Sequence, residues 1–154
     1  MLPSITMPFI PYFATSRYRV RAMIDLADIH PGEKAADLGS GDGRILVALS
    51  LAGAEAYGYE LDESYIQLAQ ENIAQQIHGA PHILLPTIYK RDFWQEDVSI
   101  YTVITVYPMP DIMEALEAKL QKELAEGARV LTNYYPFPTW KEEIKKDNIY
   151  LYRK

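Results

Sequence analysis

A glycine-rich turn in the first third of the chain constrains the fold more than any other feature. Residues 37–43 read DLGSGDG, and they connect an apolar run, Lys34–Leu38, to a second apolar run with helical spacing, Arg44–Leu51. Glycines in such a turn adopt positive φ at no steric cost and let a ligand approach the main chain. A strand, a glycine-rich turn and a helix in this order are typical of α/β folds, whose ligands bind beyond the carboxyl ends of the strands. We therefore expect the functional site at this turn.

Apolar strand-like runs alternate with helical patterns along the rest of the chain. We expect Ser16 to cap the first helix, and we expect Asp111 to cap a later helix that Gly127 terminates. The expected strands are Lys34–Leu38, 56–60, 82–86, 100–106, 128–134, 140–146 and Ile149–Arg153, and the expected helices are 16–28, Arg44–Leu51, 64–77 and 111–126. The last two strands form a hairpin around Asp147-Asn148, a dipeptide suited to a tight turn. The pattern predicts one α/β domain over residues 1–154: a doubly wound, Rossmann-like, mostly parallel seven-stranded sheet with helices on both faces and an antiparallel C-terminal hairpin.

Composition excludes several kinds of site. The 154 residues include no cysteine, which excludes disulfides, thiolate catalysis and cysteine-ligated zinc. His30, His78 and His82 are too scattered for a metal cluster or a Ser-His-Asp arrangement, so we expect no metal. The formal net charge of -6 argues against a nucleic-acid partner, because a phosphate backbone needs a basic face. No apolar run approaches the ~20 residues of a membrane helix and the N-terminus lacks a signal peptide, so we expect a cytoplasmic protein.

The charges around the turn favour a cationic ligand over a dinucleotide. A dinucleotide fingerprint would place its third glycine at position 44, where this chain has Arg44. Asp37 and Asp42 flank the turn, and two carboxylates would repel a pyrophosphate. S-Adenosylmethionine carries an ammonium and a sulfonium and has no phosphate, so it suits an acidic turn. In the alternative interpretation, Asp37 only caps the following helix, which leaves the glycines without a role.

Two further acidic residues follow expected strands at the same edge of the sheet. Glu60 ends the second strand, at the spacing where an acid meets ribose hydroxyls, and Leu61 can lie against an adenine. Asp92 follows the third strand and can accept from an adenine amino group, while Phe93 adds an apolar or stacking contact. Each acid taken singly resembles a surface residue. Together with the turn, they predict an adenosine site.

These residues resemble the class I, seven-strand methyltransferases. The chain looks closest to the small protein-lysine methyltransferases that include the ATP synthase c-subunit and ADP/ATP translocase enzymes and archaeal relatives. The resemblance runs from about Pro8 to the C-terminus. Its pieces are PFIP at 8–11, DLGSGDGRI at 37–45, GYEL at 58–61, RDFW at 91–94, GARV at 127–130 and PFPTW at 136–140.

The resemblance implies roles for individual residues. Residues 37–43 would hold the methionine part of the cofactor, Glu60 the ribose, and Asp92 with Phe93 the adenine. The N-terminal segment 1–15 would pack near the cofactor and contribute Tyr12 and Thr15. The cofactor-binding residues expected in this way are Tyr12, Thr15, Asp37, Gly39, Ser40, Gly41, Asp42, Gly43, Glu60, Leu61, Asp92 and Phe93.

The expected reaction is methylation of lysine side chains in a protein substrate. A lysine amine must lose its proton before attack, and an aromatic-lined channel lowers its pKa without a dedicated base. Tyr107, after the fourth strand, is the candidate catalytic residue in that wall, and Tyr134 and Tyr135 follow the fifth strand. We interpret Trp94, Phe137 and Trp140 as core.

The sequence departs from relatives in two respects. We expect no membrane-targeting N-terminal stretch of the kind that the mitochondrial relatives carry, so their membrane-embedded substrates are not carried over. The segment 107–110 reads YPMP in place of the element Asn/Asp-Pro-Pro-Tyr of base-modifying enzymes, which weakens a DNA or RNA base interpretation. Two alternatives stay open: a small-molecule N- or O-methyltransferase, and a cofactor-binding module that needs a partner for activity. The oligomeric state is not predicted.

Overall fold

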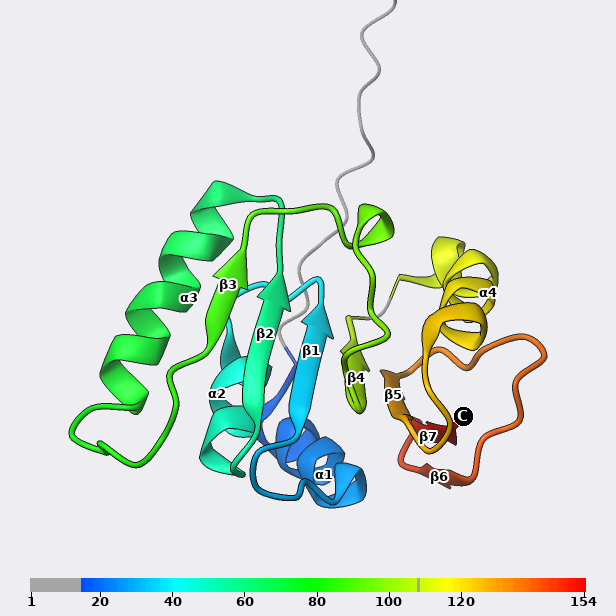
Figure 1. Cartoon of the computed structure of the whole chain (residues 1–154), viewed down its shortest axis with the longest axis horizontal. Helices are drawn as coiled ribbons and strands as arrows, with labels where there is room; N and C mark the ends of the chain where they lie inside the picture. Colours follow the sequence, from blue (N-terminus) through cyan, green and yellow to red (C-terminus); the bar gives the residue numbers. More distant parts are fainter. Residues whose placement is uncertain (1–14, 108) are drawn as a thin grey trace, which may run out of the picture.

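The computed structural model describes residues 15–107 and 109–154 of the chain. They form a seven-stranded sheet with the strand order β3-β2-β1-β4-β5-β7-β6 (Figure 1). The strands are β1 (Lys34–Leu38), β2 (Glu55–Tyr59), β3 (Thr87–Tyr89), β4 (Val103–Val106), β5 (Arg129–Asn133), β6 (Ile144–Lys146) and β7 (Ile149–Arg153). The first five are parallel, and β7 pairs antiparallel with both β5 and β6. The expected doubly wound sheet with an antiparallel hairpin is confirmed.

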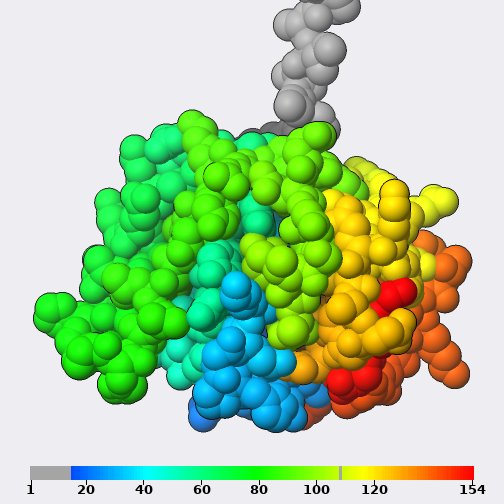
Figure 2. Space-filling view, in the orientation of Figure 1, coloured from blue at the N-terminus to red at the C-terminus, as the bar shows by residue number. Residues whose placement is uncertain are grey.

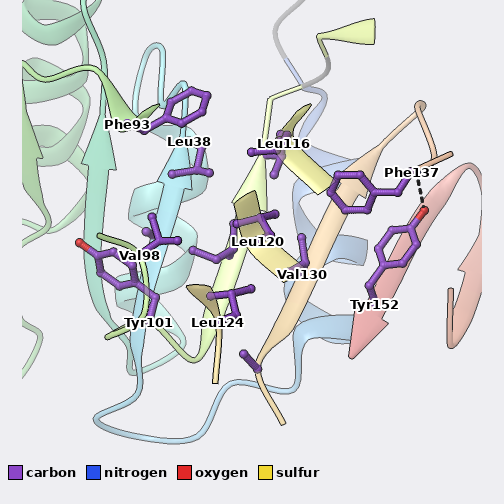
Figure 3. Packing of buried hydrophobic residues seen from close by; sticks show 14 of the residues in the cluster. Leu38, Phe93, Val98, Tyr101, Leu116, Leu120, Leu124, Val130, Phe137 and Tyr152 are labelled. Carbon is purple, nitrogen blue, oxygen red and sulfur yellow. Dashed lines mark hydrogen bonds between the residues drawn. The ribbon is translucent and has the colours of Figure 1, made fainter. Parts of the chain in front are cut away.

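Helices cover both faces of this sheet. They are α1 (Arg17–Ala27), α2 (Arg44–Leu51), α3 (Glu63–Gln76) and α4 (Met113–Glu123), together with the 3₁₀ turns η1 (Phe93–Gln95) and η2 (Pro110–Ile112). Residues of α1 and α2 share one buried apolar cluster with the sheet, α3 packs on α2, and α4 belongs to the cluster on the opposite face. Figure 3 shows Leu116 and Leu120 of α4 beside Leu38 and Val130 of the sheet. In Figure 2, side chains of the green connection from β3 to β4 also cover this face.

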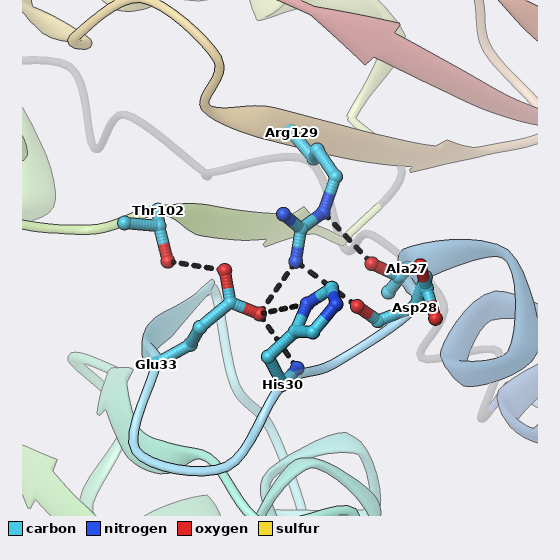
Figure 4. Close-up of polar contacts among 6 residues, drawn as sticks. All are labelled: Ala27, Asp28, His30, Glu33, Thr102 and Arg129. Atoms are coloured by element: carbon cyan, nitrogen blue, oxygen red, sulfur yellow. Dashed lines mark hydrogen bonds and ion pairs between the residues drawn. The ribbon is translucent and has the colours of Figure 1, made fainter.

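Arg129 and Glu33 tie the amino ends of the parallel strands together (Figure 4). Arg129 donates to Glu33 Oε2 at 2.6 Å and to the main-chain oxygens of Ala27 and Asp28, while Thr102 Oγ1 donates to Glu33 Oε1. Burial alone would raise the pKa of Glu33, but these hydrogen bonds outweigh burial and lower that pKa to about 2. The network therefore holds an ionised carboxylate beside a buried guanidinium at this end of the sheet.

Several expected elements differ from the observed ones. No strand forms at 82–86, because prolines bracket this segment and Leu84 and Leu85 are 60% and 63% exposed; pairing with β2 starts only at Thr87. The strands expected at 100–106 and 140–146 begin only at Val103 and Ile144. Asp111 does not cap α4, because Pro110 starts a 3₁₀ turn and the helix follows from Ile112 without a side-chain cap. Nor does Gly127 terminate this helix, which ends at Glu123 because Leu124 already has an extended backbone.

Other local expectations are confirmed with their physical causes. The bounds of β1 and α2 are those expected, and Ser16 Oγ accepts from Arg19 N to cap α1. Asp147 and Asn148 have φ of 50° and 57°, the left-handed conformation that a two-residue hairpin turn requires.

Candidate functional site

The glycine turn has the backbone conformation that the sequence predicts. Gly39, Gly41 and Gly43 have φ of 78°, 51° and 77°. A Cβ at Gly43 would lie 2.9 Å from Ala69 Cβ, and one at Gly39 would lie 3.2 Å from Tyr107 Cβ. A side chain at Gly39 or Gly43 would therefore strain the left-handed backbone and also crowd these neighbours. Gly43 begins α2 with no side-chain cap, so the alternative in which Asp37 caps that helix is wrong.

Glu60 connects the end of β2 to the turn. Its Oε1 accepts from Gly41 N at 3.0 Å, and its Oε2 accepts from Leu61 N and Asp62 N at 2.8 and 3.1 Å. Three main-chain donors thus fix the position of this carboxylate. It lies where the cofactor expectation requires an acid, against the loop that follows β1.

Asp37 is a buried carboxyl at the end of β1. Thr105 of β4 donates to Asp37 Oδ1 at 2.7 Å, and the register pairs these two residues. Burial, with smaller contributions from the charges of Glu60 and Asp42, raises the pKa of Asp37 to about 7, although the Thr105 hydrogen bond opposes the shift. The turn therefore contains a carboxyl that gains or loses a proton near neutral pH.

Asp42 differs from its sequence-based interpretation. Its carboxylate is paired with Arg44, whose Nε lies 3.0 Å from both Asp42 oxygens. Arg44 Nη1 also donates to the main-chain oxygen of Thr15 at 2.7 Å. The charge of Asp42 is thus compensated, and the argument against a pyrophosphate now depends on Asp37 and Glu60. Asp42 thus fixes Arg44, which in turn holds the main chain at Thr15, just before α1.

A cavity of about 290 Å³ lies beside the turn, at the carboxyl ends of β1, β2 and β4. The sequence-predicted residues Glu60, Leu61, Asp92 and Phe93 meet there, together with Gly39. Sequence reasoning missed the remaining lining residues, which follow β3 and β4 or end β2: Tyr59, Arg91, Trp94, Met109 and Ile112. The signal that could have found these residues is that they lie at or shortly after the ends of strands.

Asp92 and Phe93 each have a structural contact as well. Asp92 Oδ1 accepts from Trp94 N at 3.0 Å and so caps η1, while Phe93 is largely buried in the core. A small adjoining cavity is lined by Thr15, Asp37, Ser40, Gly41 and other residues of the turn, and by Tyr107. The two cavities share Gly39 as a lining residue, so they lie side by side along the sheet edge.

A larger groove of about 940 Å³ lies among α1, α2 and α3. Its walls are mostly helix side chains, including Val20, Ile24 and Gln75, and it lies to one side of the strand ends. We do not assign the cofactor to it, because ligands of doubly wound folds bind at the carboxyl edge of the sheet.

The expected aromatic residues separate into surface and core. Tyr134 and Tyr135, after β5, are 50% and 40% exposed. Phe137 is buried, and Trp94 and Trp140 pack partly buried against the same core cluster, as expected. Tyr12 lies outside the described residues.

Residues 37–144 match the family described as the ANTKMT methyltransferase domain. The chain belongs to this family. The ATP synthase c-subunit lysine N-methyltransferase of Rattus norvegicus is 34% identical over 140 residues, which cover 90% of this chain and 61% of that protein. A protein-lysine N-methyltransferase of Saccharolobus islandicus is 32% identical over 157 residues, covering 95% of this chain and 94% of the archaeal protein. The chain thus spans about three fifths of the rat relative and nearly all of the archaeal one.

A solved structure extends the comparison to the cofactor. An RNA methyltransferase from Salinibacter ruber, crystallised with S-adenosyl-L-homocysteine, has a TM-score of 0.80, 27% identity and 92% coverage of both chains. These findings confirm the expected family, the Rossmann-like fold and S-adenosylmethionine as the cofactor of this ANTKMT-family chain. Among the residues that the structure describes, no helix is long and apolar enough to cross a membrane. Nor does any group of three acidic or histidine side chains in that part of the chain come close enough to bind a metal ion.

Proposed function

We propose that this ANTKMT-family chain transfers methyl groups from S-adenosylmethionine to lysine side chains of protein substrates. One observation carries the proposal. The glycine turn and the acids after β2 and β3 meet around one cavity, in a chain whose relatives include named lysine N-methyltransferases. The proposed cofactor contacts are Tyr12, Thr15, Asp37, Gly39, Ser40, Gly41, Asp42, Gly43, Glu60, Leu61, Asp92 and Phe93.

The residues present fit the cofactor. A carboxylate has about four acceptor sites, so Glu60 keeps acceptor capacity for ribose hydroxyls beyond its three main-chain donors. Leu61 is exposed beside Phe93 and offers an apolar surface for the adenine. Asp37 and Glu60 supply negative charge for the ammonium and sulfonium groups. Ser40 Oγ is buried and has no hydrogen-bond partner among the described residues, which leaves a polar atom of the turn unsatisfied.

For methyl transfer, the protein has mainly to align the amine with the methyl group and to keep the amine neutral. When bound, S-adenosylmethionine supplies a methyl group already activated on a sulfonium. Transfer forms a nitrogen–carbon bond, breaks the sulfur–carbon bond, and requires that the amine has first lost its proton. A free lysine has a pKa of about 10.4, and apolar aromatic surroundings lower it. Tyr107 follows β4 beside Gly39, so we propose that it lines the path of the amine.

The net charge of the chain and the names of its relatives both favour a protein as the methyl acceptor. The formal net charge of -6 disfavours a polyanionic substrate, even though the Salinibacter relative is described as an RNA methyltransferase. The proposal includes a cytoplasmic location, which cell fractionation with an antibody against the chain tests. A small-molecule acceptor, or activity that needs a partner protein, is a distinct outcome of the experiment below.

The test is incubation of the full chain with methyl-labelled S-adenosylmethionine and a cell lysate, with Gly41→Val as the matched control. We expect label on lysine residues of lysate proteins, identified by mass spectrometry. Label confined to RNA or to small molecules would contradict the proposal. Valine at a φ of 51° fills space that the cofactor needs, so Gly41→Val should abolish calorimetric binding and labelling together. Unchanged affinity in that variant would move the cofactor to another site.

A further inference from the structure

Arg19 and Asn133 form a partly buried polar pair at the carboxyl end of β5, outside the proposed cofactor contacts. Arg19 Nε donates to Asn133 Oδ1 at 2.7 Å, and Asn133 is 1% exposed. Because an arginine nitrogen can only donate, the bonded atom must be the carboxamide oxygen. The Asn133 Nδ2 group is therefore the donor end of this carboxamide.

Both residues keep a buried donor without an acceptor. Asn133 Nδ2 and Arg19 Nη2 are buried and have no hydrogen-bond partner among the described residues. In that part of the chain, Arg19 also forms no ion pair with a carboxylate, although the chain carries 21 acidic and 15 basic residues. Buried polar groups are nearly always satisfied in folded proteins, and an uncompensated charge is costlier still. Two donors on hydrogen-bonded neighbours, one of them cationic, match in number the two oxygens of a carboxylate.

Tyr134 joins this pair to the surface through a strained backbone. The Arg19 guanidinium carbon lies 4.0 Å from the centre of the Tyr134 ring, and this tyrosine has a φ of 68°. Its main-chain nitrogen donates to Asn148 O at 2.8 Å, which fixes the unusual conformation against the hairpin turn. A left-handed conformation is unfavourable for a bulky aromatic residue, and such residues concentrate at binding sites. Half of Tyr134 stays exposed beside the unsatisfied donors.

Register assigns this cluster to the acceptor side of the site. The last parallel pair between β4 and β5 is Val106 with Thr132, so the next residues, Tyr107 and Asn133, lie at the same level of adjacent strands. The cavity proposed for adenosine lies around the ends of β1, β2 and β3, with Met109 and Ile112 after β4 completing its wall, and neither Arg19 nor Asn133 lines it. Asn133 is two strands away from β1, about 10 Å at the usual strand spacing. The unsatisfied donors thus lie beyond the turn and beside the tyrosine proposed to line the path of the amine.

We infer that Arg19 and Asn133 bind the carboxylate of an aspartate or glutamate that lies near the target lysine in the protein substrate. This inference deepens the proposed function and rests on it. Arg19 and Asn133 Nδ2 donate to the two carboxylate oxygens, and Tyr134 packs against the neighbouring substrate chain. The site selects lysines with an acidic neighbour, because an acidic side chain compensates the Arg19 charge whereas an amide does not.

The experiment first maps the lysine that the wild-type chain labels most strongly in lysate. That target protein is then prepared with each nearby aspartate or glutamate changed in turn to its amide. Initial rates are compared for the wild type, Arg19→Gln and the control Arg17→Gln, an exposed arginine on the same helix. We expect one acidic-to-amide change to lower kcat/KM about tenfold for the wild type and for Arg17→Gln, the size expected for a hydrogen bond to a charged group. The same change should have no effect on Arg19→Gln, because the two changes remove one interaction.

Three results would overturn the inference, each for a different reason. If changing the acidic residues of the target has no effect on kcat/KM, or has an equal effect for the wild type and Arg19→Gln, Arg19 and Asn133 do not bind a carboxylate. If Arg19→Gln weakens calorimetric binding of S-adenosylmethionine, the donors serve the cofactor instead. If Arg19→Gln lowers the melting temperature and all rates by one common factor, Arg19 is only a clamp between α1 and β5. Absence of any labelled protein despite cofactor binding would refute the proposed function itself, which these three results do not.

Discussion

The two ends of β5 carry polar side chains in opposite states. At the amino end, Arg129 has donors on a carboxylate and on two main-chain oxygens, and Glu33 has its own additional donors (Figure 4). At the carboxyl end, only four residues further along, Asn133 keeps a buried amide group without an acceptor among the described residues. Both side chains face α1, so they share one packing layer. The polar side chain at the amino end of β5 thus has its hydrogen-bond partners, whereas the one at the carboxyl end lacks a partner for its amide group.

The difference extends to the neighbouring strands. The pKa of Glu33 is held far below its usual value near the start of β1, whereas that of Asp37, near its end, is raised to about 7. A satisfied network stabilises the fold, and an unsatisfied one is costly unless a ligand completes it. The comparison suggests that residues at the amino edge govern stability, while residues at the carboxyl edge govern binding.

The largest expected effect belongs to the amino edge. Arg129→Ala should lower the free energy of unfolding by about 3–5 kcal/mol, because it leaves the Glu33 carboxylate without its buried partner. Urea unfolding measures this change. The control is Arg153→Ala, which removes an exposed pair with Glu143 and should cost under about 1 kcal/mol. Any Arg129→Ala protein that stays folded should bind S-adenosylmethionine normally, and weakened binding would erase the contrast between the two edges.

The next effect belongs to the carboxyl edge. Glu60→Ala should weaken cofactor binding by about 1–3 kcal/mol, since it strands Gly41 N and the ribose hydroxyls. Titration calorimetry measures this change in the free energy of cofactor binding. Glu63→Ala is a suitable control, because Glu63 belongs to an exposed pair with Lys90. Equal affinities for wild type and Glu60→Ala would remove Glu60 from the site.

The pH dependence of binding sharpens the comparison further. Asp37 binds its proton more tightly in the folded state than its ordinary value of 3.8 allows, so the stability it contributes is greatest at low pH and is lost as pH rises from about 4 to about 7. A cationic cofactor favours the ionised form, so binding should release a proton below about pH 7, and affinity should rise with pH up to that point. Calorimetry in buffers of different ionisation enthalpy detects the proton. Asp37→Asn should abolish the release, and proton release that persists in this variant would assign it to another group.

The smallest effect concerns the hairpin turn beside the inferred carboxylate site. Asn148 has a φ of 57°, so Asn148→Gly should raise the free energy of unfolding by less than about 1 kcal/mol. Thermal unfolding measures the gain. The substitution keeps the main-chain oxygen that accepts from Tyr134 N, so methylation rates should stay unchanged. A large loss of rate would mean that this turn does more than hold Tyr134.

The sequence predicted the fold well wherever local and global preferences agree. The glycine turn and the strand and helix around it have the expected bounds, because backbone conformation and burial favour the same structure there. The prediction failed at 82–86 and at Asp111, where prolines decide the backbone and the apolar pattern suggests otherwise. In both places a local steric rule outweighed hydrophobic periodicity.

Residues of the candidate site could be predicted only where their position directly after a strand determines where they lie. Glu60 and Asp92 follow strands, so their meeting at one edge was foreseeable. The pairing of Asp42 with Arg44 was not, because it depends on a side-chain rotamer. Nor was the pair of Arg19 and Asn133, which are 114 residues apart in sequence and meet only when α1 packs on β5.

Both edges of the sheet end in strands of three residues, β3 and β6. All three residues of β6 are exposed, and two of them are Lys145 and Lys146. An exposed strand edge offers unpaired main-chain groups to any other extended chain, and short length and lysines are the usual protection against such pairing. An enzyme that binds flexible protein segments near one end of its sheet benefits from edges that do not take up those segments as additional strands. If this chain methylates proteins as proposed, the short strands β3 and β6 would limit pairing between its sheet edges and its substrates.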